Sequence, residues 1–202
     1  MGTEKLGTEI RQEQIVQAAL GLIAQRGLKH LSVARLARRV GLVPSAIYRH
    51  YKSKDDIINA ILDEIRSNLL ANATRARQEF SDPLEILRRM LFLHIQFIRA
   101  NQSLPSVLFS EDIYFGHPDR KQKVYAMLSA YLEQVAGVIE GGQKSGVIQS
   151  KALASVLAVM FLGLIQPGAI LWQMSEGEFD VTRQAEKAWE VFQGALCGVS
   201  GA

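Results

Sequence analysis

A run of hydrogen-bond donors follows a glycine and a proline in the segment GLVPSAIYRHYKSKDDI, residues 41–57. It places two tyrosines, an arginine, a histidine and two lysines close together, with no acidic side chain before Asp55. Lysine and arginine bind phosphates, and arginine can also pair with the edge of a guanine. The segment therefore suits a negatively charged partner, and the alternative is a solvated basic surface without one.

Charge is distributed unevenly along the 202 residues, although the net charge is only +3. Residues 1–56 carry ten Lys or Arg and five Asp or Glu, whereas residues 57–202 carry thirteen and fifteen. Residues 14–54 contain no acidic side chain, and their eight basic side chains are Arg26, Lys29, Arg35, Arg38, Arg39, Arg49, Lys52 and Lys54. This asymmetry favours a polyanion, such as a nucleic acid, as the partner of the N-terminal part.

Residues 32–51 have the pattern of a helix-turn-helix, which would position these donors. Ser32 is a predicted N-cap, and Ala37 supplies the small side chain needed where two helices touch. Gly41 can adopt the positive φ of the turn, and Pro44 is tolerated in the first turn of the second helix. The side chains expected to point into the shared core are Leu36, Val40, Leu42 and Ile47.

The second short helix of this motif is predicted to enter the major groove of DNA. The residues expected to reach base edges are Val43, Pro44, Ser45, Ala46 and Arg49. Those expected to contact phosphates are Ser32, Tyr48, His50 and Lys54. For Tyr48, a place in the core beside Tyr51 is an equal alternative.

The rest of the chain also reads as helix, because its apolar residues recur at a period near 3.6 and no long stretch alternates apolar with polar residues. We predict an all-α protein of about nine helices. Outside the helix-turn-helix, helices or shorter helical segments are expected over about residues 8–25, 54–80, 82–100, 104–114, 118–145, 150–174 and 180–198. Residues 1–54 would form a three-helix DNA-binding domain, and residues 55–202 a helical bundle for ligand binding and dimerisation.

The sequence IVQAALGLIAQRGLKHLSVARLARRVGLVPSAIYRHYKSKDDI resembles the DNA-binding domain of the tetracycline-repressor (TetR) family of bacterial regulators. The ordered block G-L-x-x-x-x-I-Y-R-H-Y-K-S-K, which starts at Gly41, is the most specific part of this resemblance. The whole resemblance, over residues 10–57, covers about a quarter of the chain, and the remainder matches the family only in helix number and length. The resemblance implies a homodimeric repressor with a ligand-binding C-terminal domain. Val43 and Pro44 depart from the small polar or glycine residues of many relatives.

Residues 152–175 carry no charge and are almost entirely apolar. A membrane span is one interpretation, but Gln166 and Pro167 interrupt the stretch, and proline should kink a helix there. A helix that is apolar all round can instead lie between its own core and a second subunit. We therefore predict no membrane contact, and a dimer interface formed by Val156, Met160, Gly163, Ala188, Val191, Phe192 and Ala195.

Aromatic and methionine side chains are numerous in the C-terminal part of the chain. Individually such residues are more often core than ligand site, but together they allow an apolar pocket for a hydrophobic or amphipathic small molecule. The predicted ligand-binding residues are Phe92, His94, Phe97, Tyr114, Phe115, Met127, Tyr131, Phe161 and Trp172.

Catalytic and metal-binding patterns are missing from the sequence. It has no His-Glu-x-x-His, no Gly-x-Ser-x-Gly and only one cysteine, Cys197, so we expect no catalytic residue, no metal site and no cofactor. The N-terminal residues do not read as a secretory signal, which favours the cytoplasm. The interpretation is a ligand-responsive repressor that binds palindromic double-stranded DNA as a homodimer. The alternatives are a ligand-independent DNA-binding factor that recruits partners, and a helical-bundle enzyme or membrane-associated protein.

Overall fold

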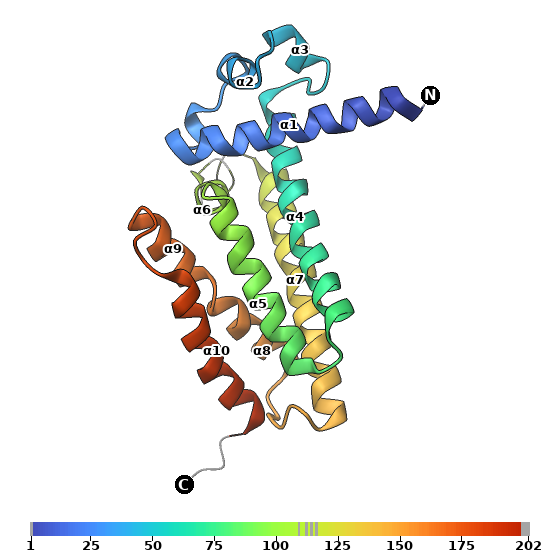
Figure 1. Cartoon of the computed structure of the whole chain (residues 1–202), viewed down its shortest axis with the longest axis vertical. Helices are drawn as coiled ribbons and strands as arrows, with labels where there is room; N and C mark the ends of the chain where they lie inside the picture. The colour runs from blue at the N-terminus through green and yellow to red at the C-terminus, as the bar shows by residue number, and fades with distance from the viewer. Residues whose placement is uncertain (1, 109, 112, 114, 116, 199–202) are drawn as a thin grey trace. The chain divides into compact units, whose positions relative to one another are not determined.

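The computed structural model describes residues 2–108, 110–111, 113, 115 and 117–198. These residues form helices and no strand, which confirms the predicted all-α class. The helices of this described part are α1 (Gly2–Arg26), the 3-10 helix η1 (Leu28–His30), α2 (Val33–Val40), α3 (Pro44–Tyr48), α4 (Lys54–Glu79), α5 (Pro83–Ala100), α6 (Leu104–Leu108), α7 (Pro118–Ser145), α8 (Ala154–Gly163), α9 (Gln166–Met174) and α10 (Val181–Cys197) (Figure 1).

The chain folds into two compact units. The first contains Met1–Ile65 and Asn101–Val124, and the second contains Arg66–Ala100 and Tyr125–Ala202. Helices α4 and α7 therefore each contribute residues to both units. This division describes compactness, whereas the boundary predicted after residue 54 is one of function, and it stays a prediction.

The core of the first unit is built from apolar side chains at helical spacing. Ile15, Ala19 and Ile23 of α1 lie four residues apart, which puts them on one face of the helix, and all three are buried. Helix α2 packs on both α1 and α3, with Leu36 and Ile47 fully buried. The short helix α6 also packs on α1. This core fixes α2 and α3 and leaves their remaining faces in solvent.

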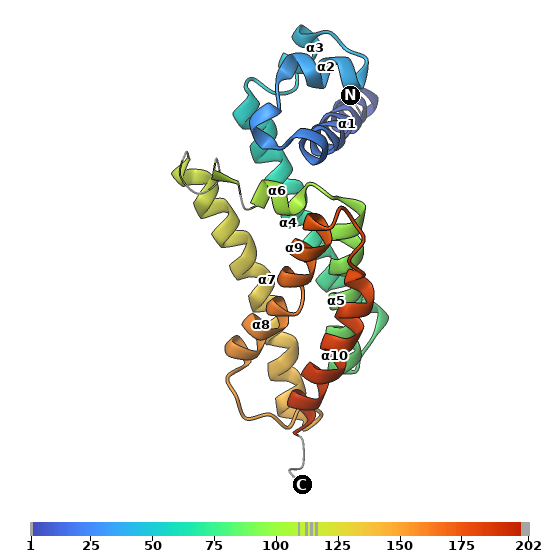
Figure 2. The same ribbon diagram turned by 90° about the vertical axis from the view of Figure 1, so that its left-hand side faces the viewer.

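In the second unit, α5 and α10 pack side by side, and α10 also packs on α9 (Figures 1 and 2). Buried aromatic side chains join α8 to α10, because the rings of Phe161 and Phe192 lie 6.0 Å apart. A polar contact joins α5 to α10, where Arg99 Nη1 donates to Thr182 Oγ1 at 3.1 Å. These contacts make the C-terminal helix an integral part of the second unit.

The apolar segment predicted as one helix over residues 150–174 forms two. Helix α8 ends at Gly163, and α9 begins at Gln166 with Pro167 in its first turn. Proline has no N–H to donate, and its ring clashes with the carbonyl four residues earlier. The predicted interruption at Pro167 is confirmed, and it is a break between two helices rather than a bend within one.

Candidate nucleic-acid interface

The turn between α2 and α3 has the geometry that the helix-turn-helix pattern predicts. The Oγ of Ser32 accepts a hydrogen bond from the backbone N–H of Arg35 at 3.3 Å, so Ser32 caps α2. Gly41 ends α2 with φ 75° and ψ 30°, a left-handed conformation that costs other residues energy. The N–H of Leu42 donates to the carbonyl of Ala37 at 2.8 Å and closes the turn.

Helix α3 is anchored on its inner side. Ile47 is fully buried against the core, and the N–H of Tyr51 donates to the carbonyl of Ile47 just beyond the helix. The half-buried Tyr51 packs inward, where its hydroxyl donates to the carbonyl of Gln12 on α1 at 3.4 Å. Burial, with a smaller contribution from the carboxylate of Glu64, raises the pKa of Tyr51. Tyr51 thus serves the fold and leaves the outer side of α3 to other residues.

The outer side of α3 presents most of the residues predicted to meet DNA. The side chain of Val43 is 62% exposed and that of Tyr48 is 51% exposed, so Tyr48 does not join the core. Pro44, Ser45 and Arg49 are also exposed, and Ala46 is half-buried. Pro44 occupies the first turn, where its missing N–H has no partner to lose. The start of α3 is small and uncharged and can approach base edges closely, and the exposed Arg49 follows the helix as its C-cap.

The predicted phosphate contacts from His50 and Lys54 lie beside the start of α4. Both side chains are half-buried. The Oγ of Ser53 accepts from the N–H of Asp56 at 3.1 Å, so Ser53 caps the first turn of α4. Nδ1 of His50 is buried without a hydrogen-bond partner, so a contact from His50 to a phosphate would have to use Nε2.

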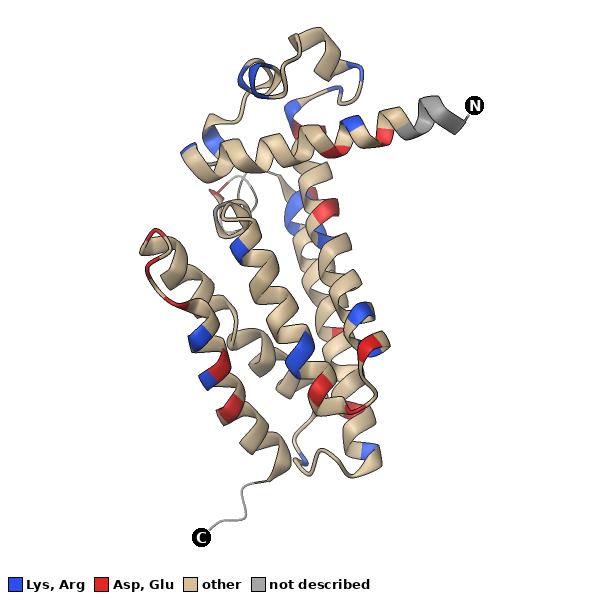
Figure 3. Cartoon of the chain, viewed as in Figure 1, with Lys and Arg blue, Asp and Glu red and all other residues tan. Residues whose placement is uncertain are grey.

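Some basic side chains of residues 14–54 already bond to other groups of the protein. Lys29 forms an ion pair with Glu111 at 2.8 Å, and Arg35 donates to the carbonyl of His30 at 3.0 Å. Basic residues lie on α2 and between α3 and α4, and no acidic residue lies on α2 or α3 (Figure 3). Exposed Arg38, Arg39 and Arg49 are therefore the better candidates for contact with a polyanion.

Two of the predicted ligand-binding residues form a buried polar pair in the second unit. Nδ1 of His94 on α5 is hydrogen-bonded to the hydroxyl of Tyr131 on α7 at 3.3 Å, and the two rings meet edge to face at 5.2 Å. Burial lowers the pKa of His94 to about 4 and raises that of Tyr131. Both groups are therefore neutral at pH 7 and can hydrogen-bond a polar group without introducing a charge.

The other predicted ligand-binding residues are scattered. Met127, Phe161 and Trp172 are buried and Phe97 is half-buried, all in the second unit. Phe115 belongs to the first unit, and its side chain is 88% exposed. Tyr114 lies outside the described residues. Among the predicted residues that the structure describes, His94 and Tyr131 form a hydrogen-bonded pair that could orient a ligand.

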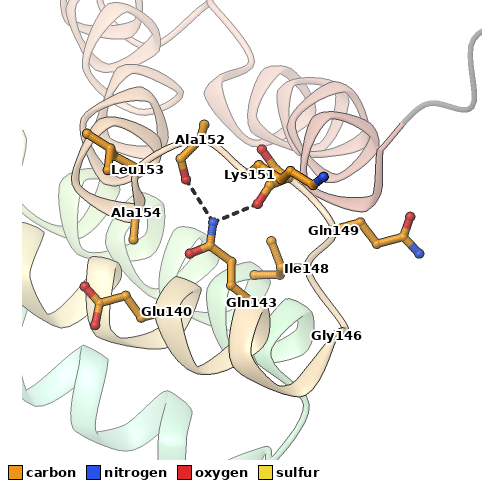
Figure 4. Close-up of a pocket in the computed structure, with 10 residues that line it drawn as sticks. Glu140, Gln143, Gly146, Ile148, Gln149, Lys151, Ala152, Leu153 and Ala154 are labelled. Carbon is orange, nitrogen blue, oxygen red and sulfur yellow. Dashed lines mark hydrogen bonds between the residues drawn. The ribbon is translucent and has the colours of Figure 1, made fainter.

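Described residues of the second unit line two surface hollows. One, of about 640 Å³, lies where α7 ends and the chain returns to α8; there Gln143 Nε2 donates to the carbonyls of Ser150 and Ala152 (Figure 4). The other, of about 320 Å³, lies between α5 and α10, where the guanidinium of Arg88 lies 5.5 Å from the ring centre of Phe92. Phe92 is the one predicted ligand-binding residue that lines either of these two hollows.

The residues predicted for a dimer interface are mostly at the surface. Val156, Met160, Gly163, Val191 and Ala195 are exposed, and Ala188 is half-buried. Phe192 is instead buried within the protomer, against Phe161 and Trp189. Sequence reasoning missed five further exposed apolar side chains of the same region, namely Leu153, Val159, Ile170, Leu171 and Met174.

Hydropathy alone would make residues 154–174 a membrane candidate, because an 18-residue window within them has a mean hydropathy of 2.0. Of that window, 39% is buried inside the protein, and residues 154–174 are divided between α8 and α9. A single candidate of this kind is weak support for a membrane span, because core helices of other proteins pass the same test. No group of metal-binding side chains is found among the described residues.

Known proteins match the chain along most of its length. Residues 15–61 match the family model described as bacterial regulatory proteins, tetR family, and residues 57–195 match that of the YsiA-like protein, C-terminal region. The fatty acid metabolism regulator protein of Bacillus subtilis (strain 168) is 22% identical over 178 residues, which cover 88% of this chain and 91% of that protein. The nucleoid occlusion factor SlmA of Vibrio vulnificus (strain YJ016) is 25% identical over 193 residues, covering 92% and 95%.

Solved structures share the fold. The transcriptional regulator FadR of Bacillus subtilis, in complex with stearoyl-CoA, superposes with a TM-score of 0.78 at 21% identity and covers 91% of this chain and 98% of its own. The fatty acid degradation regulator FadR of Bacillus halodurans gives a TM-score of 0.79 at 19% identity, covering 92% and 96%. Together with the two family models and the exposed helix α3, these matches show that the chain belongs to the TetR family of bacterial regulatory proteins and is a DNA-binding transcriptional regulator.

Proposed function

We propose that this protein is a cytoplasmic, homodimeric repressor that binds a palindromic operator and releases it when a small amphipathic ligand binds. The observation that carries the DNA-binding part is the exposed face of α3, which is held in place by Ile47 and lies within a stretch free of acidic residues. Arg49 reads bases in this proposal, whereas Lys54 contacts the phosphate backbone. Two copies of α3 about 34–36 Å apart would reach successive turns of one DNA face.

The apolar surface of α8, α9 and α10 supports the homodimer. A palindromic operator requires two copies related by a two-fold axis, and such an axis makes each copy present the same patch to the other. Val156, Met160 and Val191 are large or medium apolar side chains left in solvent by the single chain. Burying them against a second copy would remove that apolar area from water.

The proposed effector is a long-chain acyl-CoA. One relative of this fold was solved with stearoyl-CoA, and another is a fatty acid metabolism regulator. In this chain, the buried and neutral pair of His94 and Tyr131 offers hydrogen bonds inside an otherwise apolar bundle, which suits a ligand with a long apolar part and a polar group. The ligand would release DNA by binding better to a conformation whose recognition helices no longer fit the operator.

A second function is favoured by the similarity to SlmA, whose name is that of a nucleoid occlusion factor. In that alternative the chain binds DNA without a small-molecule effector and acts by recruiting a partner. Both proposals share α3 as the DNA-reading element, so only the response to a ligand separates them.

The DNA-binding part is tested with a duplex selected from random DNA by the purified protein. Arg49→Ala should lose preference for the selected sequence, because a bidentate base contact contributes about 1–3 kcal/mol to discrimination. Lys54→Ala should weaken all duplexes similarly and lower the salt dependence by about one phosphate contact. Arg66→Ala, an exposed arginine of α4 in the second unit, is the matched control. Wild-type binding by both Arg49→Ala and Lys54→Ala would refute the assignment.

The effector is tested by titrating the protein–operator complex with stearoyl-CoA, with free CoA and stearate as controls. A true effector releases the operator and also raises the melting temperature of the free protein, since a ligand present at a hundred times its Kd stabilises by about 2.7 kcal/mol. Neither release nor stabilisation would reject an acyl-CoA effector and favour the ligand-independent factor.

A further inference from the structure

Residues 101–124 belong to the same compact unit as the DNA-binding helices, although they lie far from them in sequence. Ion pairs accompany this packing. They are Lys29–Glu111 at 2.8 Å, Asp55–Arg120 at 2.5 Å and Asp63–Lys123 at 2.7 Å. Two of them join the start of α7 to the first half of α4. This segment is therefore placed to influence the end of the DNA-reading surface at which α4 begins.

Arg120 differs from the other cations of these pairs because it is buried. Its side chain is 3% exposed, and its Nη2 donates to Oδ1 of Asp55, whose side chain is 57% exposed. A buried guanidinium is strongly favoured to keep an anionic partner, because an unpaired buried charge is costly. The adjacent acid, Asp56, is not the partner in this ion pair.

Asp55 is the acid that ends the acid-free stretch of residues 14–54. It follows Lys54 directly and lies in the first turn of α4. An uncompensated carboxylate at this place would repel the phosphates that Lys54 is proposed to contact. The positive charge of Arg120 offsets the negative charge of Asp55, so Arg120 would reduce the repulsion of DNA phosphates without touching DNA.

We propose that Arg120 is a positioning residue for operator binding, which neutralises Asp55 and keeps the beginning of α4 compatible with the DNA backbone. The inference rests on the proposed operator binding and adds a second segment of the chain, residues 101–124, to the machinery that supports it. Its distinguishing feature is that it depends on charge: removing Arg120 harms DNA binding because Asp55 remains.

The test measures operator affinity by fluorescence anisotropy at several salt concentrations for Arg120→Met, Asp55→Asn and the double variant. Arg120→Met should weaken binding roughly three- to tenfold and make the dependence on salt shallower. Asp55→Asn leaves the buried Arg120 without its anionic partner and should lower the melting temperature, but the folded variant should bind the operator at least as tightly as the wild type. The double variant should return to within about twofold of wild type, because the repelling carboxylate is gone.

Two controls separate charge from structure. Lys123→Met opens the neighbouring, more exposed ion pair on the same two helices and should leave affinity within about twofold. Asp56→Asn should rescue Arg120→Met less than Asp55→Asn does, because Asp56 is not the partner in this ion pair. If Arg120→Met does not fold, as judged by thermal denaturation, Arg120→Lys replaces it as the test variant. Arg120→Lys keeps the charge and should bind nearly as wild type, whereas a loss of operator affinity of about threefold or more in a folded Arg120→Lys would overturn the proposal.

The outcomes also separate this inference from the proposed function. Wild-type protein that selects no operator refutes the proposed function and this inference with it. Wild-type protein that binds its operator while Arg120→Met binds equally well overturns the inference alone. Equal weakening by Asp55→Asn and Arg120→Met would mean that the ion pair holds geometry rather than cancels charge, which also overturns it.

Discussion

Acidification is expected to destabilise the protein through His94. Burial holds the pKa of this imidazole at about 4 in the folded chain, against 6.5 when it is exposed. Between these two values the unfolded chain binds a proton that the folded chain does not, so stability is lost as pH falls from 6.5 towards 4. Each pKa unit corresponds to about 1.4 kcal/mol, so the full loss attributable to His94 is about 3 kcal/mol. Tyr131 stays neutral in both states at these pH values and contributes nothing to the slope.

The measurement is chemical denaturation at pH 7, 6, 5 and 4.5 for the wild type and for His94→Gln, which keeps an amide able to hydrogen-bond Tyr131 but does not titrate. The variant should be less stable than wild type at pH 7 and should lose less stability on acidification, so the two curves converge. His117→Gln removes an exposed histidine and is the matched control, which should follow the wild-type curve. Parallel loss of stability in His94→Gln and wild type would refute the assignment of the acid sensitivity to this buried side chain.

Three further changes test other features. Gly41→Ala should lower the free energy of unfolding by about 1–2 kcal/mol, because a Cβ there meets no atom within 4 Å and the cost comes from the left-handed backbone alone. Gly41→Asn should cost less, because asparagine tolerates this conformation better, and equal losses in the two variants would contradict this reason. Ile47→Ala should lower stability by about 2–5 kcal/mol and release α3 from the core, so unchanged melting and unchanged operator affinity would show that the helix is held otherwise. Val191→Glu should convert the proposed dimer to monomer in sedimentation experiments, whereas Tyr125→Glu, an equally exposed position on α7, serves as control.

The helix-turn-helix was predictable because its determinants are local. Ser32 caps a helix whose first N–H groups lack partners, and Gly41 supplies a conformation that few residues tolerate. The core positions of α1 and α2 follow from spacing alone, since residues four apart lie on one helical face. The break at Pro167 was also visible, because the cause is a missing N–H in the residue itself.

The ligand-binding residues could not be chosen from the sequence, because a core and a pocket use the same aromatic and methionine side chains. Phe161 was predicted to bind ligand and Phe192 to lie in the dimer interface, yet their two rings pack against each other inside the chain. The packing of residues 101–124 with the N-terminal helices depends on contacts between distant parts of the chain. Arg120 illustrates the difficulty: nothing in its neighbourhood indicates that Asp55, 65 residues away, is its partner.

The apolar side chains that α8, α9 and α10 leave in water have a consequence for how the cell could set the activity of this regulator. If two protomers must meet before an operator can be held, occupancy of the operator rises with the square of the protomer concentration when protomers are scarce. A modest change in synthesis or degradation would then act as a second input beside the effector. Dilution at cell growth would relieve repression even where no ligand is present.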